Sequence, residues 1–426
     1  MKTLSIITSM LLVGTSISIH AASIHLLDPL ATDLAPEHID SFTAPKSAIR
    51  VDRQAVQYSR QLSTETTLTD FPAPFVKKSR SYFEQVSLVE LAKGVSLHSN
   101  SPGAVVRLTP VGKNKFLLQI ADISLRNADQ SLRLVDAAIT LADSDQLKAA
   151  GADFGTGTLA FRIKPALGSG PFELRSNAAP TASKVADASI FIHVYEPESK
   201  LSLQLTTDRM EYAEGMPMHI TASFSTDTST PADIRLTGFV STPGSRTRNL
   251  QFMPAGAGRF AADLLHDATF DAMPGLWSVH VFARGQVNQT TIYRDANTAF
   301  ASVLASARLT GTAEVQRNAT GLSVHVPIQV GRASRFGLRG VLRVMGKHGE
   351  QRAAWIAESA AWLDAGAQEL TLAFPEAAEF GAKQGARFEL HHLELRDQGR
   401  LSLLHRQARA LAFSWVDARG KGKNSP

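Results

Sequence analysis

Alternation of apolar and polar residues in short runs is the sequence feature that most limits how this chain can fold. Successive side chains of a β-strand point to opposite faces, so a run with period two has one face to bury. The clearest run is 322–330, which begins Leu322, Ser323, Val324, His325 and continues in the same manner. Similar runs, bounded by Gly, Pro, Asn and Asp, recur between residues 105 and 413. The pattern predicts an all-β protein.

The length of 426 residues exceeds what one hydrophobic core usually holds, so we expect several domains. About seven short strands in 198–307 have the size and rhythm of an immunoglobulin-like sandwich, and 308–418 repeats the pattern with a basic composition. The predicted fold class is therefore multi-domain, with immunoglobulin-like β-sandwiches in tandem after a β-rich N-terminal domain at 81–197. An extended polar arm at 23–80 precedes them, and a flexible tail at 419–426 follows.

Three local elements of this plan are specific enough to test. A short helix is expected at 144–150, because Asp143 or Ser144 can cap its start and Gly151 can end it. The nearly continuous apolar run at 116–123 predicts a strand buried on both faces. The segment 356–363 is expected to form a helical turn that crosses between sheets.

The first residues have the pattern of a secretory signal. Met1 and Lys2 give a positive start, 4–19 is apolar, and the small residues Ala21 and Ala22 follow. We predict a signal peptide at 1–22 and an exported protein, periplasmic or extracellular, without a transmembrane segment after cleavage.

The chain has no cysteine, which excludes a disulfide scaffold, thiolate zinc sites, iron–sulfur clusters and cysteine nucleophiles. The core of 198–307 must therefore be held by packing, and we expect aromatic residues and turn glycines or prolines to do this. The structural residues predicted on these grounds are Tyr212, Gly215, Pro274, Gly275, Trp277 and Trp415.

Motifs for catalysis are weak. Gly168-Ser169-Gly170 has the wrong spacing for a hydrolase nucleophile, and the adjacent His391 and His392 cannot chelate one ion from a regular strand. Asp143-Ser144-Asp145 lacks the remainder of a calcium loop and is explained by the helix cap. Glu376, Glu379 and Glu394 would serve glycoside hydrolysis only if the fold brought two of them together. We predict no catalytic, metal or cofactor-binding residue and no cofactor.

Charge is concentrated near the C-terminus. The whole chain carries a net charge of +5, and residues 309–426 hold 16 Lys and Arg against 11 Asp and Glu. A basic domain on an exported protein suits anionic surfaces such as acidic glycans, whereas no aromatic-rich motif for nucleic acid accompanies the arginines. The predicted face for an anionic ligand consists of Arg332, Arg335, Arg339, Arg343, Arg396 and Arg400. The alternative is that these arginines only keep a β-domain soluble.

Some motifs resemble a known family. The order of three motifs is similar to that in a family of secreted bacterial proteins with domain of unknown function 4785. These motifs are the segment from Ser101 to Arg107, the stretch from Asp208 to Gly215, and Pro274-Gly275-Leu276-Trp277. The resemblance covers about 80–415. It implies a three-part, mostly β, exported protein, and it assigns no catalytic residue.

The function predicted from these observations is non-catalytic binding or adhesion to a protein or an anionic glycan at the cell envelope or outside the cell. One alternative is a secreted hydrolase, or an accessory module of one, with its site in the N-terminal domain, where His98, His193 and His266 could meet in space. A further alternative is a structural part of the cell envelope that offers a sheet edge to a partner. No nucleic acid partner is expected.

Overall fold

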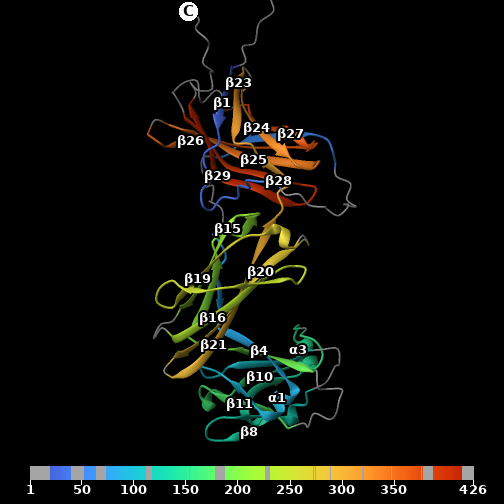
Figure 1. The fold of residues 1–426 in the computed structure, drawn as a ribbon, viewed down its shortest axis with the longest axis vertical. Coiled ribbons are helices and arrows are strands. Elements are labelled where there is room, and N and C mark those ends of the chain that lie inside the picture. The colour runs from blue at the N-terminus through green and yellow to red at the C-terminus, as the bar shows by residue number, and fades with distance from the viewer. Residues whose placement is uncertain are drawn as a thin grey trace, which may run out of the picture. The chain divides into compact units, whose positions relative to one another are not determined.

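Antiparallel sheets form almost all of the regular structure in a computed structural model of the chain (Figure 1), which confirms the all-β prediction. The structure describes residues 20–39, 52–63, 73–111, 118–152, 154–177, 188–225, 231–271, 273, 275–287, 289–318, 321–346, 348–375, 377 and 387–414. The chain divides into two compact units. One comprises 1–72, 267–269 and 303–426, and the other comprises 73–266 and 270–302.

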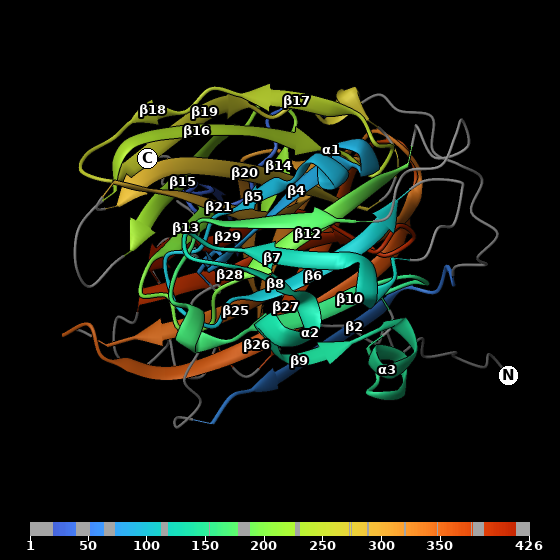
Figure 2. The ribbon, with the colours of Figure 1, turned by 90° about the horizontal axis from the view of Figure 1, so that it is seen from below.

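The N-terminal domain of the second unit, seen from below in Figure 2, has two separate antiparallel sheets. Their facing sides enclose a core that includes Leu108, Phe161, Leu174 and Ile190. In spatial order the first sheet consists of β4 (Ser81–Ser87), β12 (Ser189–Tyr195), β6 (Val105–Val111), β10 (Leu159–Ile163) and β9 (Ala138–Ala142). The second consists of β5 (Val95–Leu97), β11 (Phe172–Ser176), β7 (Ile123–Arg126) and β8 (Ser131–Arg133).

The same unit contains a middle sandwich whose core includes Leu205, Tyr212, Ile220, Val279 and Phe300. One of its sheets runs β18 (Met253–Pro254), β19 (Arg259–Leu265), β15 (Pro217–Ser225), β13 (Ser202–Thr207) and β3 (Lys77–Ser79). The other runs β14 (Glu211–Ala213), β21 (Thr290–Val303), β20 (Leu276–Val287), β16 (Ala232–Ser241) and β17 (Thr247–Leu250).

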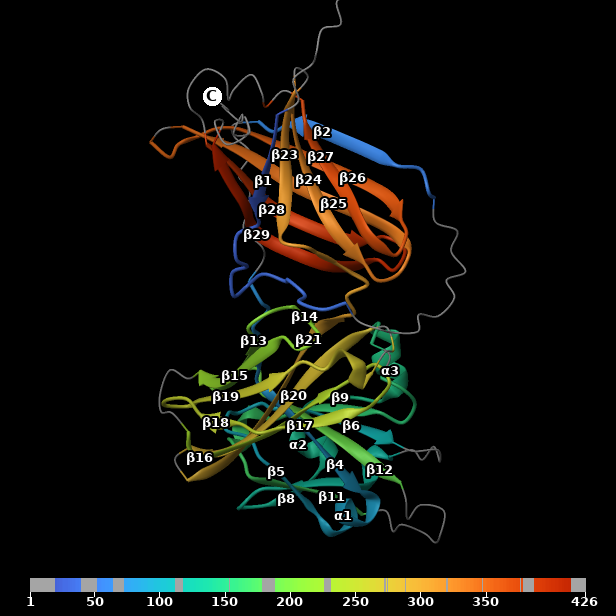
Figure 3. The same ribbon diagram turned by 45° about the horizontal axis from the view of Figure 1, so that its top comes forward.

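The C-terminal sandwich uses strands from both ends of the sequence. Figure 3 shows the blue strands β1 and β2 beside orange strands of 307–414. One sheet runs β1 (His20–His25), β23 (Thr312–Asn318), β24 (Gly321–Val330) and β22 (Ala307–Leu309), with β27 (Gly366–Phe374) also paired to β24. The other runs β2 (Val56–Gln61), β26 (Gln351–Leu363), β25 (Ser334–Met345), β28 (Arg387–Asp397) and β29 (Ser402–Ser414).

Residues 23–80, predicted as an extended arm, therefore contribute strands to these sheets. The chain between β1 and β2 also pairs with β29, where the backbones of Leu34 and Arg406 exchange two hydrogen bonds of 2.9 and 2.8 Å. Beside this bridge the buried Asp33 accepts hydrogen bonds from the backbone N–H groups of Leu30 and Ala408. β1 starts at His20, so cleavage after Ala21 or Ala22 would leave only part of this strand in the mature protein.

The helices are short and follow local capping rules. They are α1 (Leu88–Lys93), α2 (Leu134–Ala137), α3 (Ser144–Ala149) and the 3-10 turns η1 (Ile120–Asp122), η2 (Pro165–Leu167) and η3 (Ala268–Phe270). The helix expected at 144–150 is confirmed, and Asp143 caps it by accepting from the backbone N–H groups of Asp145 and Gln146. Ser87 and Glu90 form an equivalent capping box at α1.

Two local predictions are wrong. Residues 356–363 are part of β26, a strand with ladder partners on both sides, β2 and β25. The segment lacks alternation because it has buried apolar residues on both faces. Ile356 packs with Leu62 and Val341 in a small cluster on the outer side of the sheet. In the run 116–123, residues 120–122 form η1 and the strand β7 starts only at Ile123, while 116–117 lie outside the described residues.

The paired N-terminal segment should contribute measurably to the stability of the first unit. Replacing Leu34, which is 1% exposed, by alanine should lower the free energy of opening of this unit by about 2–4 kcal/mol because it leaves a cavity. Hydrogen exchange measured by mass spectrometry would follow the protection of β25 and β29 in the first unit separately from that of β6 and β20 in the second. The control Leu30→Ala changes a side chain that is 57% exposed and should have little effect. Equal protection in both variants would contradict a docked segment.

Candidate binding surface

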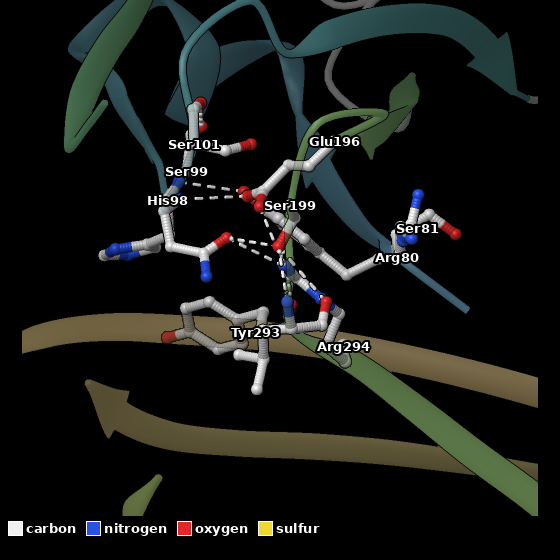
Figure 4. A network of polar contacts seen from close by, with 12 residues as sticks. Arg80, Ser81, His98, Ser99, Ser101, Glu196, Ser199, Tyr293 and Arg294 are labelled. Atoms are coloured by element: carbon white, nitrogen blue, oxygen red, sulfur yellow. Dashed lines mark hydrogen bonds and ion pairs between the residues drawn. The ribbon is translucent and has the colours of Figure 1, made fainter. Parts of the chain in front are cut away.

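A buried arginine joins the N-terminal domain to the middle sandwich. The side chain of Arg294, on β21, reaches the turn that follows β12, as Figure 4 shows. Its Nη2 lies 2.7 Å from Glu196 Oε2, 2.8 Å from Asn100 Oδ1 and 2.9 Å from Ser199 Oγ. Nη1 and Nε donate to the backbone oxygens of Tyr293 and Leu201. All three guanidinium nitrogens are thus hydrogen-bonded, as burial of this charge requires.

We call this contact region between the N-terminal domain and the middle sandwich the joint, and neighbouring groups add further hydrogen bonds to it. Glu196 accepts a further hydrogen bond from the backbone N–H of Asn100, and Arg80 donates to the oxygen of Pro197. The Tyr82 hydroxyl accepts from the backbone N–H of His98, and burial raises the pKa of Tyr82. The predicted boundary between 81–197 and 198–307 therefore falls within this buried joint, because Glu196 and Ser199 both contact Arg294.

A second contact across the joint involves a carboxyl group. Asp295, the next residue on β21, accepts a hydrogen bond of 2.7 Å from the backbone N–H of Phe83 on β4. Burial raises the pKa of Asp295 to about 6, an effect only partly offset by this hydrogen bond and by the charges of Arg294 and Lys77.

The joint places the outer face of the first sheet of the N-terminal domain next to the outer face of the middle sandwich. Residues directly opposite each other on neighbouring strands share a face, and His193 lies opposite both Phe83 and Arg107. Phe83 and Phe191 are 43% and 36% exposed, although their chemical type favours burial.

A row of aromatic rings crosses from one domain to the other. The Phe83 ring packs edge-to-face against Phe191, at 6.0 Å between centroids, and against Phe282 of β20, at 5.5 Å. Phe282 contacts Phe239 of β16 at 6.1 Å, and Phe239 stacks on His280 at 4.8 Å. We call these five residues the aromatic row. Four strands of two domains contribute to it.

Positive charge accompanies the aromatic row. Arg107 stacks over the Phe154 ring, with Cζ 4.2 Å from the ring centroid, and Arg284 lies over Tyr293 at 5.6 Å. Arg235 lies directly opposite Arg284 on the ladder between β16 and β20. Among the described residues, none of these three arginines forms an ion pair with a carboxylate.

Acidic groups are scarce on the same face. The outward positions in register on β4, β12, β6, β10 and β9 carry no carboxylate, and those on β16, β20 and β21 carry only Asp295, which is 9% exposed. Outside this register, the exposed Asp233 lies in the bulge of β16, two residues before Arg235. Burial lowers the pKa values of His193 and His280, and for His193 the charge of Arg107 adds to this. These histidines are therefore neutral at pH 7 and can both donate and accept hydrogen bonds.

The arginines predicted to bind an anionic ligand have different environments in the C-terminal sandwich. Arg332 is exposed, but Arg335 is only 8% exposed. Arg335 donates to Gln398 Oε1 and to the backbone oxygens of Asp52 and Gln54, so it holds the chain leading into β2. Nε and Nη1 of Arg335 are therefore occupied inside the protein.

The other four arginines lie beside acidic residues or a histidine. Arg400 bonds Asp397, which is fully buried and also accepts from Ser306 and Ser334. Arg339 pairs with Glu358 at 3.3 Å, and Arg396 pairs with Glu394 at 2.9 Å. Arg343 is half-buried near His391, whose neighbour Glu389 also binds Arg409. Neutralisation by these carboxylates makes the surface less basic than the composition suggested.

The structural residues of the middle sandwich lie in its core or turns. Tyr212 is fully buried, packs edge-to-face on Phe300 and donates from its hydroxyl to Asp208 Oδ1 at 2.6 Å. Trp277 is 4% exposed and contacts the same phenylalanine. Gly275 has a φ of 141°, and an added Cβ would lie 2.9 Å from Pro243 Cγ.

Gly215 occupies a turn with a φ of 73°, a conformation that favours glycine. Pro274 and Trp415, the remaining structural predictions, lie outside the described residues.

The groups considered for chemistry are dispersed. His98 packs on Tyr293, His193 lies beside Arg107, and His266 contacts Trp277. A bulge separates Leu390 from His391, and His392 has a φ of 50°, yet the described part of the chain holds no cluster of three metal-binding side chains. Glu376 and Glu379 lie outside the described residues.

Comparison with known proteins identifies the family. Profiles for the N-terminal and C-terminal domains of a domain of unknown function, DUF4785, match residues 47–196 and 306–414. The chain belongs to the DUF4785 family. No curated protein gave a significant match.

One solved structure, that of a DUF4785 family protein, agrees with this at the level of the fold. A DUF4785 family protein from Legionella pneumophila matches with a TM-score of 0.68 and 22% identity, covering 89% of this chain and 98% of that one. Salmonella alpha-2-macroglobulin matches at 12% identity and a TM-score of 0.18, covering 93% of this chain and 28% of that one. The Escherichia coli adhesin FdeC matches at 12% identity and a TM-score of 0.14, covering 81% of this chain and 99% of that one.

The aromatic row of this DUF4785 protein could not be predicted from its sequence. Alternation places Arg107 on one face of its strand, but it does not show that the face is open or that Phe282 lies beside Phe83. Phenylalanines at alternating positions are normally assigned to a core. The signal that could have helped is that β12 carries large apolar residues on both faces, since Ile190 and Ile192 already fill the core.

Breaking the buried pair should be costly. Arg294→Met would leave Glu196 buried without its cation and should lower the unfolding free energy of the second unit by about 3–5 kcal/mol. Adding Glu196→Gln should restore part of this loss, because the remaining buried group is neutral. Arg126→Met breaks an exposed pair with Glu173 and should cost less than about 1 kcal/mol. Denaturant unfolding followed by hydrogen exchange would measure all three. Similar effects for Arg294→Met and Arg126→Met would contradict the joint.

Asp295 should make the same joint sensitive to pH. The pKa of Asp295 is raised in the folded state. Its contribution to the free energy of unfolding is therefore fully present below about pH 4 and is lost as pH rises through 6. Between pH 4 and pH 7 the wild-type protein should lose up to roughly 3 kcal/mol relative to Asp295→Asn, which cannot ionise. Urea unfolding of both proteins across this range measures the difference. A constant difference between them would show that Asp295 has an ordinary pKa.

Proposed function

We propose that this protein is an exported, non-catalytic binding protein, and that it holds its partner on the face that carries the aromatic row. The observation that carries the proposal is the exposure of Phe83 and Phe191 on a sheet face with unpaired arginines. Aromatic and arginine side chains are enriched at recognition surfaces, where acidic and lysine residues are depleted. Export is supported by the signal-like start of the sequence.

Several features support binding over catalysis. The described titratable groups with strongly shifted pKa values are Tyr82, Tyr212, Asp295 and His405, and each is buried and hydrogen-bonded to neighbouring backbone or side chains, so they stabilise the fold. A pocket of about 280 Å3 lies beside β2 and β24, and Tyr58 is the one titratable residue among the described residues that line it.

Within the described residues, no helix has the length and apolar character needed to cross a membrane.

The proposal predicts retention on the natural partner. The mature protein, mixed with isolated cell envelopes of the producing cell or with its culture fluid, should be recovered in the bound fraction. The double variant Phe83→Ala/Phe191→Ala should lose most of this retention, because it removes two exposed rings without opening the core. Phe75→Ala, which removes a ring that is 64% exposed elsewhere, is the matched control. Retention that is equal for both variants would exclude the aromatic row as the binding surface.

A further inference from the structure

The geometry points to an acidic polysaccharide as the ligand of the aromatic row, an assignment that rests on the proposed binding function. The row and its arginines combine three kinds of group on one face. Exposed rings offer apolar walls, neutral histidines and hydroxyls offer hydrogen bonds, and guanidinium groups offer positive charge. A pyranose unit with a carboxylate presents the complementary set: C–H faces, hydroxyl groups and a negative charge.

The rings form a corrugated surface. Phe83 stands at 86° to Phe191 and at 81° to Phe282, whereas Phe239 is tilted by 30° from Phe282 and by 21° from His280, so the angle between neighbouring rings changes along the row. Successive nucleic acid bases stack in parallel on aromatic platforms, and this row does not repeat a parallel platform. Sugar units need no mutual stacking and can each contact a differently tilted ring. All five rings lie on strands of paired sheets, which fixes their positions.

Hydrogen-bonding groups accompany the rings. His280 stacks on Phe239 and lies 3.0 Å from the Ser241 hydroxyl through Nε2, and His193 lies next to Phe83 on the ladder. Both histidines are only partly buried, and sugar hydroxyls both donate and accept hydrogen bonds, as neutral imidazoles do.

The arginines supply charge that the protein itself leaves uncompensated. Like charges directly opposite on a ladder destabilise a sheet, and Arg235 and Arg284 occupy such positions. Arg107 contacts the face of Phe154, which orients its guanidinium group but does not neutralise it. Local rules of this kind are broken mainly at functional sites. Carboxylates of a polysaccharide would neutralise these groups through paired hydrogen bonds.

A direct test measures binding of the mature protein to polygalacturonate, alginate and hyaluronan at several salt concentrations. Methyl-esterified polygalacturonate, polyglutamate and single-stranded oligothymidine are the comparison probes. At least one acidic polysaccharide should bind more tightly than all three comparison probes. Failure of every acidic polysaccharide to bind at low salt, or tighter binding of the oligonucleotide or the peptide, overturns the assignment.

Two double variants separate the contribution of the aromatic rings from that of the arginine charges. Phe83→Ala/Phe191→Ala should weaken binding about tenfold or more at every salt concentration without changing the salt dependence. Arg107→Gln/Arg235→Gln should weaken binding and also make it less dependent on salt. Phe75→Ala and Arg126→Gln are controls on other surfaces, and losses as large in these controls would show non-specific attraction and overturn the assignment. If polysaccharides fail but Phe83→Ala/Phe191→Ala still reduces envelope retention, only the ligand class is wrong and the binding function stands.

Discussion

A guanidinium group that leaves water must find hydrogen-bond acceptors for its nitrogens, and much of the second unit depends on how Arg294 meets this demand. Its acceptors come from β12's following turn, from the loop after β5 and from its own strand. Because the group has one arrangement that satisfies it, the two domains meet in one register. Apolar packing alone would tolerate small shifts between them, whereas a displaced arginine would leave Glu196 without its cation.

The aromatic row depends on that register. Phe83 and Phe282 belong to different domains, and their contact exists only while β4 lies against β20 and β21. Asp295 holds the Phe83 backbone by a hydrogen bond, and ionisation of this buried carboxyl group lowers the stability of the joint. The aromatic row and the stability of the joint are therefore parts of one arrangement, in which buried polar groups determine where exposed rings lie.

The sequence was sufficient for the fold class, because period-two alternation such as that of 322–330 reports directly on a strand with one buried face. It was also sufficient for α3, where Asp143 caps the helix through contacts two and three residues away. It failed where burial is not one-sided, as in β26, which has buried apolar residues on both faces and so lacks the alternation that marks a strand. The arginine face stays a prediction, because composition counts charges but does not show which of them are paired. Arg335 and Arg400 lie against partners that only the tertiary structure brings together.

The place of β1 and β2 in the C-terminal sandwich has a consequence for synthesis. β1 pairs with residues 312–317, and β2 pairs with residues 355–360. These two strands leave the ribosome early, but their ladder partners are translated only after both other domains. The two sheets of the C-terminal sandwich thus pair strands that are separated by about 300 residues in the sequence, and such long-range pairing makes folding slow. A nascent chain interrupted before residue 312 would hold two strands without their ladder partners, and their unpaired edges would be exposed to aggregation.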